Sequence, residues 1–282
     1  MNSVTPDPNK AARELLAFYA EAGVDAPMQE EPVDRFAGDA AIPAQTEPAR
    51  SPDNVRAGAA DRPAPILQRA TPASAFATAS PDAAALAARE AARNAASLED
   101  LRAILQGFDG CSLKATATQL VFADGNPRAP LMLVGEAPGR DEDLEGLPFV
   151  GRSGKLLDRM LAAIGLDRTK VYIANIVPWR PPGNRTPTPQ ESQICLPFIL
   201  RQIELADPEI LVCLGGPSAQ ALLGIKDGIR KARGRWLTFD TGTREIRALA
   251  TFHPAYLLRS PLEKRLAWRD FLAIKTALSP AS

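Results

Sequence analysis

From residue 97 onward, short apolar runs alternate with segments whose apolar residues recur at helical spacing. The apolar runs cover residues 131–135, 171–175, 210–214 and 246–251, and the helical segments cover residues 154–164, 189–205, 218–223 and 263–278. Such alternation is typical of a mostly parallel sheet that carries helices on both faces. The sequence therefore predicts an α/β domain over residues 97–282, a three-layer sandwich with a central mostly parallel sheet flanked by helices.

The first 96 residues do not share this pattern. Residues 27–81 are rich in Ala and Pro and show little periodicity, which predicts a disordered linker. Residues 11–22 carry apolar side chains at helical spacing and are followed by Gly23, which predicts a short helix. Two interpretations of that helix stay open: a marginal isolated helix, or a docking element for a protein partner. Residues 82–94 are Ala-rich and predict at most a helix at the margin of the domain.

Charge is divided unevenly along the chain. Residues 1–96 hold 9 Lys and Arg against 13 Asp and Glu, whereas residues 97–282 hold 24 against 20. The basic excess thus lies in the part that is expected to fold, where contacts to nucleic-acid phosphates would be made. No apolar run reaches the roughly 18 residues that a membrane span needs, and residues 1–10 lack the features of a signal peptide. We therefore expect a cytoplasmic protein without a membrane partner.

A loop rich in Gly and Pro follows the first apolar run, in the segment LMLVGEAPGRDEDLEGLPFVGRSG of residues 131–154. A carboxylate at a strand end, here Glu136, can position or deprotonate a water. Phe149 offers a flat face on which a nucleobase can stack. Two alternatives stay open: the loop only shapes a turn while Phe149 belongs to the core, or the loop cradles a phosphate. The dinucleotide pattern G-x-G-x-x-G and the P-loop lysine are both absent.

The second motif, NIVPWRPPGNRTPTPQE, covers residues 175–191. Asn175 ends an apolar run, and its amide group presents one acceptor and two donors, which matches the O4 and N3–H edge of uracil and mismatches cytosine. Arg180 and Arg185 in the loop that follows are suited to phosphate contacts. The alternative is an ordinary surface loop with a turn-forming Asn.

The third motif, TFHPAYLLR, covers residues 251–259 and contains His253, the one histidine of the chain. An imidazole at a strand end can stabilise negative charge on a departing base, although a structural histidine is the alternative. Arg259 is a candidate for a phosphate contact. Tyr256, Leu257 and Leu258 pack either against a distorted duplex or in the core.

A fourth segment, IRKARGRW of residues 229–236, concentrates positive charge in Arg230, Lys231, Arg233 and Arg235. Such a cluster predicts a loop that contacts phosphates. A solvated run of charges is the alternative.

Taken together and in this order, the motifs GEAPG, PFVG, RPPGNR and HPxxLLR resemble those of type 4 uracil-DNA glycosylases over residues 97–277. The resemblance implies an enzyme that flips deoxyuridine out of DNA and hydrolyses its N-glycosidic bond, as the start of base excision repair. It implies site residues as well. Glu136 and the backbone at Ala137 hold water and uracil, Glu142 is a second acidic site residue, Phe149 stacks on uracil, and Asn175 reads the edge of uracil. His253 belongs to the closing motif, and the segment that intercalates into DNA consists of Tyr256, Leu257, Leu258 and Arg259.

The sequence departs from that family at the family's [4Fe-4S] cluster, which four cysteines hold. Cys111 and Cys195 match two ligand positions, but Phe108 and Trp179 stand at the other two. Two thiolates cannot complete a cluster that takes four. We therefore expect no cofactor, with Phe108 and Trp179 stabilising the fold by burial, at about 1.5–3 kcal/mol for each large side chain. Cys213, in another apolar run, is expected in the core, and three cysteines make no disulfide framework.

No lysine stands in the motifs of the resemblance to attack the sugar, so a monofunctional glycosylase without lyase activity is expected. We also expect the protein to be a monomer. Three other functions stay open: a protein that traps uracil-DNA covalently, a catalytically silent uracil-DNA-binding protein, and a hydrolase of small nucleotides. Covalent trapping would need a further histidine in the basic segment, and that segment has none.

Overall fold

The structure of the protein is a computed structural model that describes residues 81–279. The helix predicted over residues 11–22 and the linker up to residue 80 lie outside the described residues. Within residues 81–279, no helix combines the length and the apolar character that crossing a membrane requires.

A six-stranded sheet forms the centre of the domain, in the order β1-β3-β2-β4-β6-β5. Its strands are β1 (Asp124–Gly125), β2 (Leu131–Gly135), β3 (Tyr172–Asn175), β4 (Ile210–Leu214), β5 (Trp236–Asp240) and β6 (Glu245–Thr251). β3, β2, β4 and β6 run parallel, and β1 and β5 pair antiparallel at the two edges. The predicted mostly parallel sheet is confirmed. In a sheet of this kind, ligands bind outside the carboxyl ends of the parallel strands.

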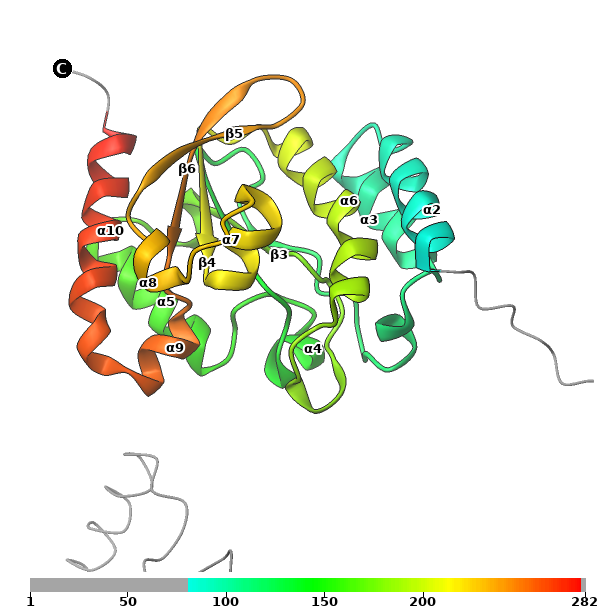
Figure 1. Ribbon diagram of the computed structural model, residues 1–282, viewed down its shortest axis with the longest axis horizontal. Coiled ribbons are helices and arrows are strands. Elements are labelled where there is room, and N and C mark those ends of the chain that lie inside the picture. The colour runs from blue at the N-terminus through cyan, green and yellow to red at the C-terminus, as the bar shows by residue number, and fades with distance from the viewer. Residues whose placement is uncertain (1–80, 280–282) are drawn as a thin grey trace, which may run out of the picture. The chain divides into compact units, whose positions relative to one another are not determined.

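Helices cover both faces of the sheet, as Figure 1 shows, with α5 and α10 on one side and α2, α3 and α6 on the other. The helices are α2 (Pro81–Arg93), α3 (Leu98–Gly107), α4 (Arg140–Glu145), α5 (Arg152–Ala163), α6 (Pro189–Ala206), α7 (Gly216–Leu223), α8 (Ile229–Ala232), α9 (Pro254–Arg259) and α10 (Lys264–Leu278). Short 3-10 turns are η1 (Ser112–Ala115), η2 (Arg168–Lys170), η3 (Pro182–Asn184) and η4 (Pro261–Glu263).

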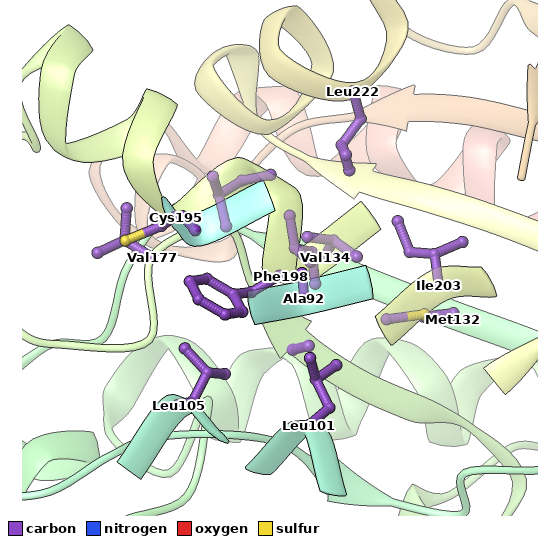
Figure 2. Packing of buried hydrophobic residues seen from close by; sticks show 14 of the residues in the cluster. Ala92, Leu101, Leu105, Met132, Val134, Val177, Cys195, Phe198, Ile203 and Leu222 are labelled. Carbon is purple, nitrogen blue, oxygen red and sulfur yellow. The ribbon is translucent and has the colours of Figure 1, made fainter. Parts of the chain in front are cut away.

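The side chains of β2 show how the three layers are held together. Met132 and Val134 belong to the hydrophobic cluster that contains α3 and α6, whereas Leu131 and Leu133 belong to the cluster that contains α5 and α10. Successive side chains of a strand point to opposite faces, so an apolar run without a polar interruption is buried on both. Figure 2 shows the first of these clusters, in which Phe198 of α6 lies among side chains of α3 and β2.

The folded domain begins before residue 97, so the predicted domain start is corrected. α2 packs along α6, and its alanines, among them Ala88 and Ala92, are buried in the same cluster as the sheet. Alanine buries little apolar area for each residue, and for this reason the sequence predicted α2 only as a helix at the margin of the domain. The small side chains on the buried face of α2 let the two helices lie close together.

Candidate active site

A cavity of about 460 Å³ opens at the carboxyl ends of the four parallel strands. Glu136 follows β2, Asn175 ends β3, Gly215 follows β4 and His253 follows β6, and all four residues line this cavity. The acid, the amide and the imidazole that the sequence singled out in three separate motifs therefore share one pocket. Several other predicted site residues line it as well: Ala137, Glu142, Phe149, Arg185, Tyr256 and Arg259.

Asn175 is the most deeply placed polar group of the site, at 5% relative exposure. Its Oδ1 is buried, and no described residue gives it a hydrogen bond. A buried acceptor without a partner destabilises a protein by about 1–3 kcal/mol. The arrangement is therefore suited to a ligand that brings an N–H donor to this oxygen.

Gly135 makes the space in front of that amide. It lies opposite Asn175 in the register between β2 and β3. A Cβ atom on Gly135 would lie 2.4 Å from Asn175 Oδ1 and 2.7 Å from Phe149 Cζ. No side chain fits there without displacing both groups, so the glycine keeps the floor of the pocket open.

Phe149 forms one wall of the pocket and is nearly fully buried, with its ring centroid 5.4 Å from that of His253 and the two rings tilted by 32°. Its backbone φ is 56°, a left-handed conformation that is rare for a bulky residue. Gly154 permits this conformation, because a Cβ there would lie 1.6 Å from the Phe149 carbonyl oxygen. A planar base can thus be enclosed by the ring and the neighbouring polar groups.

His253 caps the N-terminus of α9 and is held in one tautomer. Its Nδ1 accepts a hydrogen bond from the backbone N–H of Ala255 at 3.1 Å. Burial, with a smaller contribution from the charge of Arg259, lowers the pKa of His253 to about 4. The ring is therefore neutral near pH 7, its proton lies on Nε2, and that nitrogen is a donor.

Glu136 lines the cavity at the start of the loop that follows β2, and its backbone carbonyl accepts a hydrogen bond from the N–H of Val177 at 3.0 Å. Burial raises the pKa of the Glu136 carboxyl. A carboxylate with a raised pKa is a stronger base than an ordinary one, as activation of a water requires.

Glu142 is buried, and its carboxylate connects two loops of the site. It accepts hydrogen bonds from the N–H of Gly139 at 3.0 Å, of Val150 at 3.1 Å and of Gly151 at 3.0 Å. Three backbone donors occupy its oxygens, and for this reason the geometry favours a role in holding the loops over a direct contact with substrate.

Of the predicted phosphate-binding residues, Arg185 and Arg259 line the cavity, and most of the set is paired with other side chains. Arg185 forms two hydrogen bonds with Glu191, at 2.7 and 2.8 Å, and Arg180 donates to Asn184 at 2.6 Å. In the basic segment, Arg230 pairs with Glu263 at 2.6 Å and donates to the Tyr256 hydroxyl, and Lys231 pairs with Asp227 at 3.1 Å. Glu191 is buried, and its two hydrogen bonds with Arg185 help to lower the pKa of that carboxyl to about 2. The pairs of Arg230 and Lys231 lie at the surface, and such pairs hold their partners weakly.

Two of the predicted DNA contacts are corrected by the structure. The Arg233 guanidinium binds the buried carboxylate of Asp270 and the carbonyl of Leu266. Leu257 is 1% exposed and belongs to a hydrophobic cluster with Phe252. The partners of Arg233 lie 33 and 37 positions away in the sequence, which a local motif does not reveal. Leu257 packs with Ala267 as well as with Phe252 of its own motif. By contrast, Leu258 and Arg259 are exposed.

Sequence reasoning missed the contribution of β4, whose end carries no polar motif. Gly215, at φ 104°, lets the chain pass His253, since a Cβ there would lie 3.1 Å from the Cβ of His253. Gly216 and Pro217 also line the cavity. The available signal was the glycine pair directly after a buried apolar run, which allows close approach of the backbone to a ligand.

The positions that the resemblance assigns to cluster ligands hold a mixed set of side chains. Cys111 and Cys195 are buried, with 3.8 Å between their Sγ atoms. Trp179 is buried in the core, and the ring of Phe108 packs edge-on against Phe198, with 5.0 Å between centroids. The described residues contain no group of three or more His, Cys, Asp or Glu side chains that would hold a metal ion. The residues present do not fit a four-iron cluster, which takes four thiolates. The third cysteine, Cys213, is buried in β4, and burial raises the pKa of its thiol.

Comparison with known proteins defines the class to which this fold and pocket belong. The family model of the uracil DNA glycosylase superfamily matches residues 122–272, and the chain belongs to that superfamily. Three of its similar relatives are type-4 uracil-DNA glycosylases. The one from Archaeoglobus fulgidus is 41% identical over 182 residues, which are 63% of this chain and 92% of the relative. The one from Thermotoga maritima is 44% identical over 151 residues, 53% of this chain and 77% of the relative. The one from Saccharolobus solfataricus is 41% identical over 174 residues, 60% of this chain and 81% of the relative.

Proposed function

We propose that this protein is a monofunctional uracil-DNA glycosylase that hydrolyses the N-glycosidic bond of deoxyuridine in DNA and leaves an abasic site, the first step of base excision repair. The observation that carries the proposal is the unpartnered Oδ1 of Asn175, buried in a pocket that Phe149, Glu136 and His253 also line. Uracil has an N–H donor at N3 for this oxygen, and cytosine has none at that position.

The reaction follows from the placement of the side chains. An extruded uracil stacks on Phe149 and donates its N3–H to Asn175. Glu136 accepts a proton from a water while the oxygen of that water bonds to the sugar carbon C1′. The bond between C1′ and the base breaks, and its electron pair leaves with uracil. Nε2–H of neutral His253 donates to the uracil anion and stabilises its charge.

The absence of lysine among the described residues that line the cavity supports a glycosylase without lyase activity. A lysine amine would be needed to attack the sugar and form a Schiff base. Water is then the nucleophile, and the product keeps an intact DNA strand.

The proposal includes activity without an iron–sulfur cluster. Support comes from the aromatic side chains of Phe108 and Trp179, which pack where the resemblance places two cluster ligands. Iron analysis and the absorption spectrum of anaerobically purified protein test this point. We expect a protein that contains no iron and excises uracil. Four iron atoms for each chain, the content of one [4Fe-4S] cluster, would contradict this expectation.

Several further points are proposals at the same level. Exposed Arg259 and the basic side chains of the loop before α6 contact DNA phosphates. The protein works as a monomer in the cytoplasm, and a protein partner for residues 11–22 remains one interpretation of that segment. Salt dependence of DNA binding, gel filtration and co-purification test these points in turn.

Incubation of the purified protein with a uracil-containing oligonucleotide, followed by alkaline cleavage of abasic sites, tests the function directly. Strand cleavage only after alkali is the expected result. The competing functions give other outcomes: binding without base release for a silent protein, a heat-stable adduct with DNA for a covalent trap, and preferential release of uracil from free nucleotides for a nucleotide hydrolase.

A further inference from the structure

Arg168 lies outside the cavity, on η2 between α5 and β3, yet its guanidinium binds the backbone of the loop that carries Phe149. Nη1 donates to the carbonyl of Pro148 at 3.1 Å, and Nη2 donates to the carbonyl of Phe149. The same guanidinium is fixed from behind by Asp124 on β1 and by Asp158 on α5, the latter at 2.8 Å. One planar cation thus connects four groups, through charge-assisted hydrogen bonds that are stronger than neutral ones.

The peptide that Arg168 holds is the strained one. A left-handed conformation at a non-glycine residue destabilises the chain by about 1–3 kcal/mol and persists only where the surroundings enforce it. At Phe149, whose φ is 56°, Arg168 binds the carbonyl side and the Glu142 carboxylate binds the two N–H groups that follow, those of Val150 and Gly151. A cation and an anion therefore hold the same short loop from its two sides.

The conformation of Phe149 decides where its ring lies. With φ at its present value the ring is buried, lies against His253 and comes within reach of the space above Gly135. Release of the carbonyl would let φ return to the negative range that bulky residues prefer, and the ring would leave this position. The stacking surface for the base thus depends on a contact made on the far side of the loop.

We propose that Arg168 is a positioning residue of the active site, which acts through Phe149 by holding its strained peptide and thereby its ring against the bound uracil. Arg168 itself touches no substrate. The expected effect on the excision rate rests on the proposed glycosylase function. The expected effect on the position of the Phe149 ring rests on geometry alone, so the proposed function and the role of Arg168 can fail separately.

The kinetic test is a double-mutant cycle under single-turnover conditions. Arg168→Gln removes the charge, and we expect a fall in the rate of uracil excision of about 100-fold, the scale of a misplacement of about 1 Å in an active site. In a Phe149→Ala background the same change should have almost no effect, because the ring through which it acts is gone. Arg168→Lys, which keeps the charge but cannot bridge two carbonyls and two carboxylates, should fall between wild type and Arg168→Gln.

A matched control is available at Arg244, which lies away from the cavity. Its guanidinium binds the carboxylate of Asp207 at 2.6 Å and the carbonyls of Asp207 and Pro208, each at 3.1 Å. Arg244→Gln removes a similar set of contacts, so we expect a lower Tm and an unchanged excision rate. Equal rates for Arg168→Gln and Arg244→Gln would overturn the proposal, and so would a full effect of Arg168→Gln in the Phe149→Ala background.

A spectroscopic arm is independent of catalysis. 4-Fluorophenylalanine at position 149 gives a 19F resonance that reports the surroundings of the ring. We expect a displaced resonance in Arg168→Gln and Arg168→Lys and an unchanged one in Arg244→Gln. An unchanged resonance in folded Arg168→Gln would overturn the proposed role of Arg168, whether or not the protein is a glycosylase. If the wild-type protein excised no uracil, only the proposed function would be overturned.

Discussion

Gly135 and Asn175 lie opposite each other in the neighbouring parallel strands β2 and β3, and a Cβ on Gly135 would come within 2.4 Å of Asn175 Oδ1. The amide can therefore face an open pocket only because its neighbour in the sheet has no side chain.

Gly135→Ala tests this relationship. The added methyl group would displace the amide of Asn175 and the ring of Phe149, so we expect uracil excision to fall by about 100-fold or more. Single-turnover kinetics on a uracil-containing oligonucleotide measure the change. Gly107→Ala is the matched control: nothing lies within 4 Å of a Cβ there, and its rate should equal that of the wild type. Equal rates for the two variants would contradict the assigned role of Gly135.

Asn175→Asp should change which base is accepted. A carboxylate has no N–H to donate, so the donor pattern of the site is lost and uracil excision should drop by about 1,000-fold or more, as for other sites that leave a buried polar group mismatched. Protonated, the same side chain can pair with cytosine, and slow release of cytosine is expected. Assays with both bases in matched oligonucleotides measure this. Unchanged uracil excision without cytosine release would show that Asn175 does not read the base.

The acid limb of the pH–rate profile should belong to Glu136. Burial raises the pKa of this carboxyl above its ordinary value of 4.5, so the group is protonated, and unable to accept a proton from water, at a higher pH than an ordinary carboxyl. We expect the single-turnover rate to fall below that raised pKa, and Glu136→Gln to lose about 100- to 10,000-fold in rate at pH 7. A profile whose midpoint lies at or below the ordinary value would argue against Glu136 as the base.

His253 should make the folded state sensitive to mild acid. The pKa of this histidine is lowered from about 6.5 in the unfolded chain to about 4 in the folded protein. The unfolded state therefore binds the proton first, and stability that is fully present above pH 6.5 is lost as pH falls toward 4, by up to about 3 kcal/mol. Urea unfolding at pH 7.5 and pH 5 measures this loss. In His253→Asn, which has no histidine left, the part of the pH dependence due to this group should disappear.

Trp179→Ala should destabilise the protein without a metal being involved. Removal of a buried aromatic side chain destabilises a protein by about 3–5 kcal/mol, and Trp179 is among the largest fully buried side chains. Denaturant unfolding with and without a chelator measures the effect. The two wild-type curves should coincide, and a wild-type protein that loses stability in the chelator would speak against the packing role of this residue.

The sequence predicted the four central strands because β2, β3 and β4 are buried along their whole length and are written almost entirely in apolar residues. In β6 the buried stretch is shorter than the strand and runs from Ala248 to Thr251. The sequence did not reveal the edge strands. β1 has two residues, and β5 pairs antiparallel at an edge with Trp236, Thr238 and Asp240 exposed, so neither offers a continuous apolar signal. The short helices α4, α8 and α9 were missed as well, since four to six residues span too few turns for a period to be recognised.

The site itself divides along similar lines. Glu136, Asn175 and His253 could be found because each follows an apolar run, and parallel strands bring their carboxyl ends together. The internal role of Arg233 could not be found, because Asp270, which binds it, is 37 positions away in the sequence. Arg168 shows the same limit: a guanidinium that reaches across the chain to Phe149 leaves no local pattern.

The hydrogen bond from Ala255 to His253 ties the helix α9 to the imidazole, and it has a mechanical consequence. The first turn of α9 fixes the tautomer of the ring, and the exposed Arg259 lies at the other end of the same helix. If Arg259 contacts DNA as proposed, a strain placed on that helix by a bound duplex would reach the Nε2–H donor that is proposed to stabilise the departing base. DNA binding and cleavage of the glycosidic bond would then both depend on helix α9. Variants that loosen the first turn of α9 should therefore lower both DNA affinity and the rate of excision.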